Sequence, residues 1–280
     1  MSVEKQVAAH YGRSGSEKPL LDALRAAGKD VDRLTTADLA PVDEFHLGWR
    51  AATVGFGKAL AFPSGAHVLD IGSGIGGPAR YLAETFGVTV TGIDLTPEYV
   101  ALADALTRRV GLADRVAFRE ANALALPFDD ASFDGAYNIH VAMNIADKVK
   151  LIAETLVAET RRVPKTGATF GIYDVMRVAV GDLPYPLPWA LTGETSFVEP
   201  SAAYRQWLGA AGFTIVSERD RSAEVKEIVR ANRERLEREG SSALGPHTLM
   251  GPGWAERSAN AGKALQQGLI APVEIIARAA

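Results

Sequence analysis

A glycine-rich loop next to two aspartates is the part of this chain best suited to hold a ligand. The loop 72–77, Gly-Ser-Gly-Ile-Gly-Gly, directly follows the apolar run His67–Ile71, which predicts a buried strand. Glycines let backbone N–H groups approach a ligand closely, and the N-terminus of a following helix adds partial positive charge. Asp94 ends the next apolar run, where a carboxylate can accept hydrogen bonds from ribose hydroxyls. We therefore predict that the loop binds a cofactor containing adenosine.

Asp70, two positions before the loop, narrows the choice of cofactor. A carboxylate is a poor neighbour for a pyrophosphate, because both carry negative charge. S-adenosylmethionine has no phosphate. Its ammonium group favours a nearby carboxylate, and its own carboxylate suits the N–H groups of the loop. The pattern therefore favours S-adenosyl-L-methionine as the cofactor and S-adenosyl-L-homocysteine as its product.

Two other functions remain open at this point. The loop also fits the Gly-x-Gly-x-x-Gly pattern through Gly72, Gly74 and Gly77, which is typical of NAD(P)-dependent Rossmann oxidoreductases. Asp70 argues against an oxidoreductase, and so does the lack of any tyrosine followed four positions later by lysine. The second alternative is a non-catalytic module that only binds S-adenosylmethionine.

Four segments, in order along the chain, resemble motifs of the class I S-adenosylmethionine-dependent methyltransferases. Residues 68–76 resemble the first motif of that family, and Asp94 resembles its ribose-binding acid. Residues 122–128 resemble its adenine-binding segment, and residues 133–135 resemble the start of its fourth strand. The family usually has Asp where this chain has Asn122, whose amide oxygen can still accept a hydrogen bond from the adenine amino group. The resemblance implies a cofactor site formed by Asp70, Gly72, Ser73, Gly74, Gly76, Asp94, Leu95, Asn122 and Ala123.

His140 follows the fourth predicted strand and is the candidate catalytic base. Ligands of open α/β sheets bind outside the carboxyl ends of the strands, where this residue falls. Residues 138–145 resemble a subgroup that carries Gln-His-x-x-Met-His-Ile here and acts on natural products, sugars, tocopherol-like phenols and glycine-derived amines. His140 matches this pattern, whereas Ile139 and Asn144 depart from it. The alternative for His140 is a structural role. For Asn138 we predict a contact with the amino-acid end of the cofactor through its backbone.

The N-terminal segment resembles the same subgroup. Residues 43–53 resemble a Phe-His-x-Gly-Gly-x-x-Ala-Thr stretch of its bacterial members, with Trp49 in place of the second glycine. The resemblance implies that His46 contacts the cofactor, with a helix cap as the alternative. Tyr11 is predicted to close over the site.

A proline-rich stretch with several aromatic residues follows the fifth predicted strand. We predict that Met143, Tyr185 and Trp189 contact the methyl acceptor, and that Phe197 belongs to the same hydrophobic lid. Packing of this stretch onto its domain is the alternative. His247 and Met250 are further pocket candidates.

Alternating strands and helices over residues 67–175 predict an α/β fold with a parallel sheet and helices on both faces. Strands are expected at 67–71, 88–94, 116–121, 135–139, 168–175, 213–218 and 273–277, and helices at 79–86, 97–110, 148–163, 200–211 and 223–239. The resemblance adds a Rossmann-like sheet of seven strands, mostly parallel, whose last strand is antiparallel. We expect one methyltransferase domain over 1–280, with an N-terminal helical cap (1–62), a cofactor-binding core (63–175), and cap inserts at 176–200 and 221–268. Residues 245–253 are expected to form a loop.

Composition limits the remaining possibilities. The chain has 280 residues, a net charge of −4 and no cysteine, which excludes thiolate chemistry and cysteine-bound metals. No metal site is expected, because Asp174 has no matching Asp-Asn partner. The acidic balance argues against nucleic acid as a partner, and we see neither a signal peptide nor a run that could span a membrane. We therefore expect a cytoplasmic protein, monomeric or homodimeric, that acts on a small-molecule acceptor.

Overall fold

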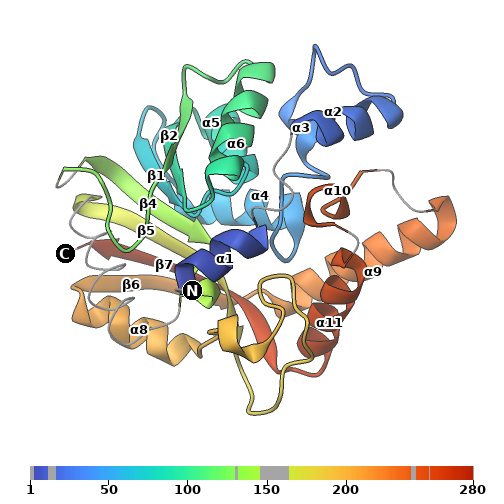
Figure 1. Cartoon of the computed structure of the whole chain (residues 1–280). Coiled ribbons are helices and arrows are strands. Elements are labelled where there is room, and N and C mark those ends of the chain that lie inside the picture. The colour runs from blue at the N-terminus through green and yellow to red at the C-terminus, as the bar shows by residue number, and fades with distance from the viewer. Residues whose placement is uncertain are drawn as a thin grey trace.

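A seven-stranded sheet with the order β3-β2-β1-β4-β5-β7-β6 forms the centre of the protein (Figure 1). The computed structural model describes residues 3–11, 17–129, 132–145, 164–240, 244–251 and 253–279. Strand β7 pairs antiparallel with both β5 and β6, and the other pairs are parallel. The strands are β1 (His67–Ile71), β2 (Thr89–Asp94), β3 (Val116–Glu120), β4 (Phe133–Ile139), β5 (Pro164–Arg177), β6 (Phe213–Asp220) and β7 (Ile270–Ala279). The predicted Rossmann-like α/β fold is confirmed.

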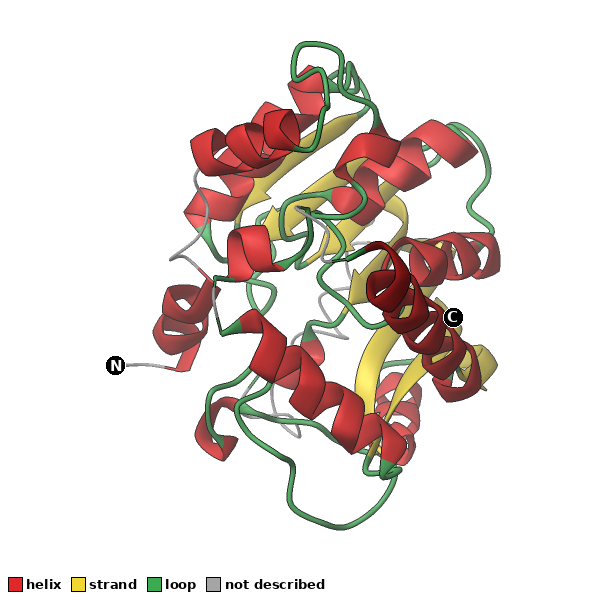
Figure 2. Cartoon of the chain, turned by 90° about the vertical axis from the view of Figure 1, so that its right-hand side faces the viewer, coloured by secondary structure: helices red, strands yellow, loops and turns green. Residues whose placement is uncertain are grey.

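Helices lie on both sides of the sheet (Figure 2). The first helices are α1 (Val3–Tyr11), α2 (Glu17–Ala26), α3 (Thr36–Leu39), α4 (Trp49–Leu60), α5 (Gly77–Phe86) and α6 (Pro97–Arg109). The later helices are η1 (Ala142–Asn144), η3 (Gly193–Thr195), α8 (Ser201–Ala210), α9 (Ser222–Glu239), α10 (His247–Met250) and α11 (Trp254–Gln266). In Figure 1, α9, α10 and α11 gather beyond one end of the strands, away from α8.

Two hydrophobic cores cover the two faces of the sheet. Side chains of successive strand residues point to opposite faces. Val68 accordingly packs with Phe56 of α4 and Leu82 of α5, whereas its neighbour Leu69 packs with Trp207 of α8. All five are buried, so the alternation of apolar residues decides which helix each face receives. Packing on both faces therefore holds the sheet in place, and the sheet in turn positions the loops at its carboxyl edge.

The expected strand and helix positions are largely those observed, with differences at the ends. Strand β1 has its predicted bounds, while β5, β6 and β7 extend beyond theirs, because pairing with β7 continues past the apolar runs. The prediction of a loop at 245–253 is wrong, since α10 lies within it. Helix α11 was not expected as a separate element. The predicted helix at 148–163 lies outside the described residues, and the division into cap and core stays a prediction.

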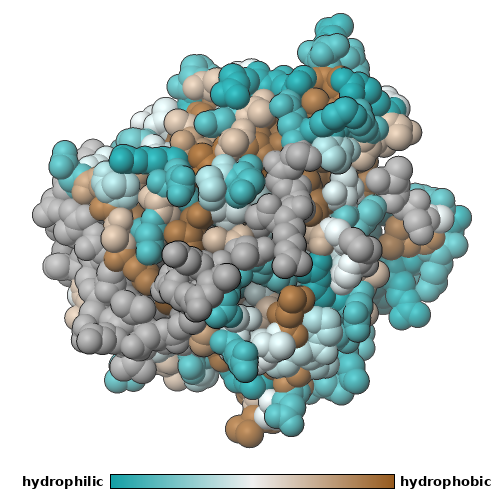
Figure 3. Space-filling model, in the orientation of Figure 1, coloured by the Kyte–Doolittle hydropathy of each residue, from teal (hydrophilic) through white to brown (hydrophobic). Residues whose placement is uncertain are grey.

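Helix α9 presents a solvated, charged surface, as its sequence suggests. Arg230 pairs with Glu227 and with Glu234 at 2.6 Å, and all three side chains are more than half exposed. Hydrophilic residues accordingly dominate this side of the molecule (Figure 3). None of the described helices has the length and apolar character needed to cross a membrane.

Candidate active site

A cavity of about 260 Å³ opens at the carboxyl ends of β1, β2 and β4. The register of the sheet explains why these strand ends meet, because Ile71 lies level with Ile93 on one side and Asn138 on the other. Chain segments that leave the three strands there must therefore face one another. Most of the predicted site residues line this cavity, namely Tyr11, His46, Asp70, Gly72, Ser73, Gly74, Asp94, Leu95, Asn122, Ala123, His140, Met143 and Trp189.

The glycine loop is tied to β2 by hydrogen bonds of its own backbone. The N–H groups of Gly72 and Ser73 both donate to the carbonyl oxygen of Ile93 at 2.8 Å. The N–H of Gly74 donates to Asp94 Oδ2 at 2.9 Å, and the N–H of Thr96 donates to Asp94 Oδ1 at 2.9 Å. A carboxylate oxygen can accept more than one hydrogen bond, so Asp94 can hold the loop and still accept from a ligand.

Two glycines of the loop have conformations that other residues adopt rarely. Gly72 has φ 75°, and a Cβ placed on it would lie 2.4 Å from Val141 Cγ2. Gly74 has φ 53°, and a Cβ there would come no closer than 3.9 Å to Phe45. Space for a side chain is therefore missing at Gly72 and present at Gly74. Because Gly74 also lines the cavity, its backbone faces the cavity directly.

Asp70 brings a buried carboxyl group to the cavity. Only 2% of the residue is exposed, and Oδ2 has no hydrogen-bond partner among the described residues. Burial raises the pKa of Asp70 to about 8, against the smaller opposing effect of the Tyr137 hydroxyl. Such a carboxyl group lacks a cation, and an ammonium group in the cavity would supply one.

Asn122 forms a local turn at the edge of the cavity. Its Oδ1 accepts a hydrogen bond from the N–H of Leu124 at 2.9 Å. The same oxygen has a second lone pair, and Asn122 and Ala123 both line the cavity. The turn therefore fixes the side chain but leaves one acceptor position for a ligand.

His140 lies in a strained backbone conformation at the end of β4. Its φ is 54°, which non-glycine residues rarely adopt, and its N–H donates to the carbonyl of Tyr173 at 2.8 Å. Nε2 is buried without a partner among the described residues. Burial and the nearby His46 hold the pKa of His140 well below its ordinary value, so the ring is neutral at pH 7.

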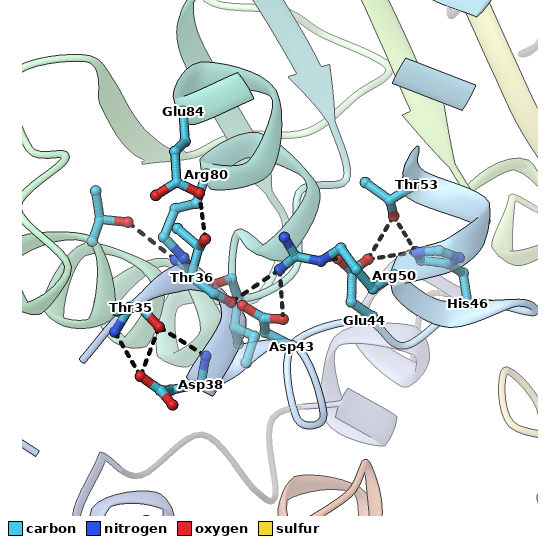
Figure 4. Close-up of polar contacts among 12 residues, drawn as sticks. Thr35, Thr36, Asp38, Asp43, Glu44, His46, Arg50, Thr53, Arg80 and Glu84 are labelled. Atoms are coloured by element: carbon cyan, nitrogen blue, oxygen red, sulfur yellow. Dashed lines mark hydrogen bonds and ion pairs between the residues drawn. The ribbon is translucent and has the colours of Figure 1, made fainter. Parts of the chain in front are cut away.

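His46 belongs to a buried polar cluster rather than to a helix cap (Figure 4). Its Nε2 lies 2.7 Å from Glu44 Oε2, and the hydroxyl of Thr53 donates to the same oxygen at 2.7 Å. Arg50 Nε lies 2.6 Å from Glu44 Oε1. Burial raises the pKa of Glu44, but the hydrogen bonds and charges of His46 and Arg50 outweigh it and lower that pKa. The ionised Glu44 thus orients His46, whose ring centroid lies 5.7 Å from that of His140.

Arg80 connects the glycine loop to its surroundings, and Figure 4 shows this residue beside the cluster of Asp43 and Arg50. Its side chain is fully buried, and Nη2 donates to Asp43 Oδ2 at 2.9 Å and to the carbonyl of Ile75 at 2.8 Å. Nη1 donates to the hydroxyl of Thr107 on α6 at 3.1 Å. One guanidinium group therefore joins the loop, α6 and the segment that carries Glu44 and His46.

Helix α1 contributes Val7 and Tyr11 to the lining of the cavity, and the closing of Tyr11 over the site stays a prediction. The Tyr11 hydroxyl accepts a hydrogen bond from Asn144 Nδ2 at 3.3 Å, and burial raises its pKa. His10 Nε2 lies 3.0 Å from the carbonyl oxygen of Pro188. The N-terminal helix thus contacts both the segment after β4 and the proline-rich loop.

Three predicted site residues lie outside the cavity lining. Gly76 packs α5 against β3, since a Cβ on it would lie 2.3 Å from Phe118 Cζ. Asn138 is buried within β4 with 1% of its surface exposed. Tyr185 packs among apolar residues of the proline-rich loop, and its ring lies beside Gly193. Of the further candidates, Met250 lines the cavity, whereas His247 and Phe197 do not.

Sequence reasoning missed the contribution of α11 to the cavity. Trp254, Ser258, Ala261 and Leu265 all line it, and their spacing of four, three and four residues places them on one face of the helix. That spacing is visible in the sequence and could have been found. Tyr99 and Phe45 also line the cavity, with ring centroids 5.9 Å apart, but no local pattern distinguishes them from core residues.

Asp174 has a structural role. Its Oδ2 accepts hydrogen bonds from the N–H of Ala142 at 2.9 Å and from the hydroxyl of Tyr204 at 3.3 Å. These bonds hold the segment that follows His140. Within the described residues, no group of three histidine or acidic side chains is placed to hold a metal ion, and the absence of a metal stays a prediction.

Comparison with known proteins connects this geometry to a family. Residues 69–171 match a family model described as a methyltransferase domain. Over 193 residues the chain is 32% identical to an O-methyltransferase of Penicillium expansum, covering 68% of this chain and 65% of that protein. Geranyl diphosphate C-methyltransferase from Streptomyces coelicolor A3(2) aligns with a TM-score of 0.68 at 16% identity, over 100% of this chain and 99% of that chain. The cyclase SpnF aligns with a TM-score of 0.61 at 21% identity, over 93% and 92% of the two chains.

The chain therefore carries a class I S-adenosylmethionine-dependent methyltransferase domain. Its matches to curated relatives span 24% to 65% of those relatives' own length. The likeness to the two solved structures concerns the fold, and the presence of a cyclase among them means that the acceptor chemistry has to be argued from the cavity itself.

Proposed function

We propose that this protein transfers a methyl group from S-adenosylmethionine to a hydroxyl, an amine or an activated carbon of a small molecule. The observation that carries the proposal is the hydrogen bond from the N–H of Gly74 to Asp94, together with the Asp70 carboxyl oxygen that has no partner within the described part of the chain. This arrangement offers a carboxylate to an ammonium group, N–H groups to a carboxylate and Asp94 to a ribose.

The residues of the cavity fit each part of that cofactor. Asp70 would accept from the ammonium group, and Asp94 with Leu95 would hold the ribose. Asn122 and Ala123 would contact the adenine, with the second lone pair of Asn122 Oδ1 accepting from its amino group. When bound, S-adenosylmethionine supplies an electrophilic methyl group on a sulfonium. The same fit disfavours the nicotinamide alternative, because Asp70 would then face a pyrophosphate.

His140 is the candidate base for a hydroxyl acceptor. Its ring is neutral, and its Nε2 has no partner among the described residues. The residue directly follows β4 and lines the cavity. The ring of His46, held by Glu44, lies beside it and would orient it. Helix α1 would keep water out through the contact of Tyr11 with Asn144.

Calorimetric titration with S-adenosylhomocysteine and S-adenosylmethionine tests the cofactor part of the proposal. We expect saturable binding of both, and no binding of either would overturn it. Incubation of the protein with a metabolite pool and methyl-labelled cofactor then tests the transfer, with label expected in a small-molecule product. Label that remains in the cofactor pool despite tight binding would favour the non-catalytic alternative.

Further features of the proposal rest on composition alone. A cytoplasmic location, a monomeric or homodimeric state and the lack of a nucleic-acid partner stay predictions. The small-molecule acceptor is supported by the cavity of about 260 Å³ and by the small-molecule methyltransferases among the relatives.

A further inference from the structure

Three of the four tryptophans of the chain line the cavity. Trp49 begins α4, Trp189 lies in the proline-rich loop after β5, and Trp254 begins α11. The fourth, Trp207, packs in the core under the sheet. Segments far apart in the sequence thus bring three indole rings to one cavity.

Helix α11 completes this side of the cavity with small and apolar side chains. Ser258, Ala261 and Leu265 follow Trp254 along the same face of the helix. Asn260 Nδ2 donates to the carbonyl of Pro186 at 2.9 Å, which ties the helix to the loop that carries Trp189. We call the surface formed by Trp49, Trp189, Trp254, Ser258, Ala261 and Leu265 the acceptor chamber.

The acceptor chamber contains no charged side chain. Among the described residues that line the whole cavity there is no lysine or arginine, and the carboxylates are Asp43, Asp70 and Asp94 on the glycine-loop side. Arg257 of α11 does not belong to the lining; its guanidinium donates to the carbonyls of Gly253, at 3.1 Å, and Met250. An ionised group on a ligand would lose its hydration here without gaining a partner.

Trp49 is held in a conformation that a tryptophan rarely adopts. Its φ is 44°, in the left-handed region that favours glycine. Strained conformations of bulky residues persist where the surroundings determine them, and they cluster at functional sites. Trp189 is oriented as well, because its Nε1–H donates to Ser196 Oγ at 2.9 Å, which leaves the face of its ring for packing. The ring of Trp189 therefore presents a fixed, flat apolar surface, and Trp49 lines the same cavity.

Two polar atoms of the cavity lining are buried without a partner among the described residues. Asn144 Oδ1 is a hydrogen-bond acceptor, and His140 Nε2 is one in the tautomer that carries the ring proton on Nδ1. A buried acceptor without a donor is unfavourable, so a ligand that fills the cavity should bring a donor. A hydroxyl group meets this need without adding charge.

From these observations we infer that the methyl acceptor is an uncharged, flat ring compound that carries a hydroxyl group, packed between the indole rings and α11. The inference rests on the proposed function and names the acceptor class of the same site. Anionic acceptors, such as phosphates and carboxylates, and cationic amines are the competing classes.

Three naphthalene derivatives that share one ring system and differ in the charge of the substituent test the inference. The protein, saturated with S-adenosylhomocysteine, is titrated calorimetrically at pH 7 with 2-naphthol, 2-naphthoate and 2-naphthylmethylammonium. We expect 2-naphthol to bind at least about tenfold more tightly than either ion, because each ion would be buried without a partner. Equal or tighter binding of 2-naphthoate or of the ammonium compound would overturn the inference.

A pair of variants locates the binding in the acceptor chamber. Ser258→Lys places a cation in the chamber, while Ala259→Lys adds the same charge at the exposed neighbouring position. Ser258→Lys should shift the preference by about tenfold or more toward 2-naphthoate, and Ala259→Lys should leave it within about twofold. An unchanged preference in a Ser258→Lys protein that melts like the parent would overturn the inference; if that variant fails to fold, the ranking in the parent still decides.

Binding of the cofactor is measured in the same preparation, so that the two failures are distinguishable. Protein that binds S-adenosylhomocysteine but shows no preference for 2-naphthol contradicts the inference and leaves the proposed function standing. Protein that does not bind S-adenosylhomocysteine contradicts the proposed function. In that case, titration with the three probes alone still tests the chamber.

Discussion

The two sides of the cavity are built in different ways. On the glycine-loop side, backbone groups at the ends of parallel strands hold the polar atoms, as in the bond from Gly74 to Asp94. In the acceptor chamber, side chains from α11 and the proline-rich loop meet through tertiary packing and single contacts, such as that of Asn260 with Pro186, and α4 adds Trp49 to the lining. The first side depends on local backbone conformation, and the second on how distant segments pack.

The two sides of the cavity therefore differ in the substitutions that they can tolerate. Changes on the glycine-loop side alter strand ends and buried hydrogen bonds that the sheet itself needs. The apolar surface of the chamber can be repacked while volume and hydrophobic character are kept. We therefore expect the cofactor requirement to be robust and the acceptor preference to change with few substitutions.

The largest effect is expected at His140, which lies where the two sides meet. His140→Asn removes the base, and asparagine is among the residues that best tolerate the left-handed backbone found there. Turnover of an identified hydroxyl acceptor should fall by about 10²- to 10⁴-fold, while the affinity for S-adenosylhomocysteine stays near that of the parent. Steady-state rates and calorimetry check both. The control is His67→Asn, a histidine at the start of β1 that does not line the cavity. Full turnover by His140→Asn would exclude the base role.

Arg80 tests whether the glycine-loop side depends on its buried support. Arg80→Met removes the partner of the buried Asp43 carboxylate and should lower the free energy of unfolding by about 3–5 kcal/mol. Arg205→Met breaks an exposed pair with Glu218 and should cost no more than about 1 kcal/mol. Urea unfolding measures both. Losses of similar size in the two variants would mean that Arg80 does not hold the loop as its contacts indicate.

The sequence allowed much of the glycine-loop side to be predicted, for a physical reason. A strand, a turn of glycines and a helix start are local, and their residue types follow from backbone conformation, as at Gly72 and Gly74. Strand β1 was therefore placed with its correct bounds. Gly76 fits the same motif but serves packing against Phe118, which only the fold reveals.

The acceptor chamber was predicted less completely, because its residues are brought together by tertiary packing. The aromatic character of Trp189 and Tyr185 is equally visible in the sequence, yet only Trp189 lines the cavity. The pairing of His46 with Glu44 depends on how the chain turns before α4. In α11, the spacing of the four cavity-lining residues can be read from the sequence, but serine and alanine among them make this apolar pattern weaker than that of a core helix.

A substitution at Asp94 tests whether ligand binding on the two sides of the cavity is independent. Asp94→Ala should weaken binding of S-adenosylhomocysteine by about 10- to 150-fold, because hydrogen bonds to a charged group contribute about 1.5–3 kcal/mol. Binding of 2-naphthol in the chamber should change little. Calorimetric titration of both ligands checks this, with the exposed Glu98→Ala as control. Equal loss for both ligands would show that the two sides are not independent.

The smallest effect is the pH dependence of cofactor binding, and it comes from Asp70. Burial raises the pKa of this carboxyl to about 8 in the protein without ligand, so it is mostly protonated at pH 6. The ammonium group of S-adenosylhomocysteine favours the ionised form, so binding releases the proton. Affinity should therefore rise between pH 6 and pH 8, by up to about 50-fold for a carboxyl with this pKa. Calorimetry in two buffers of different ionisation enthalpy should show the released proton. Asp70→Asn should bind more weakly at pH 8 and show a flat profile, whereas a parent protein with a flat or falling profile would remove Asp70 from the ammonium site.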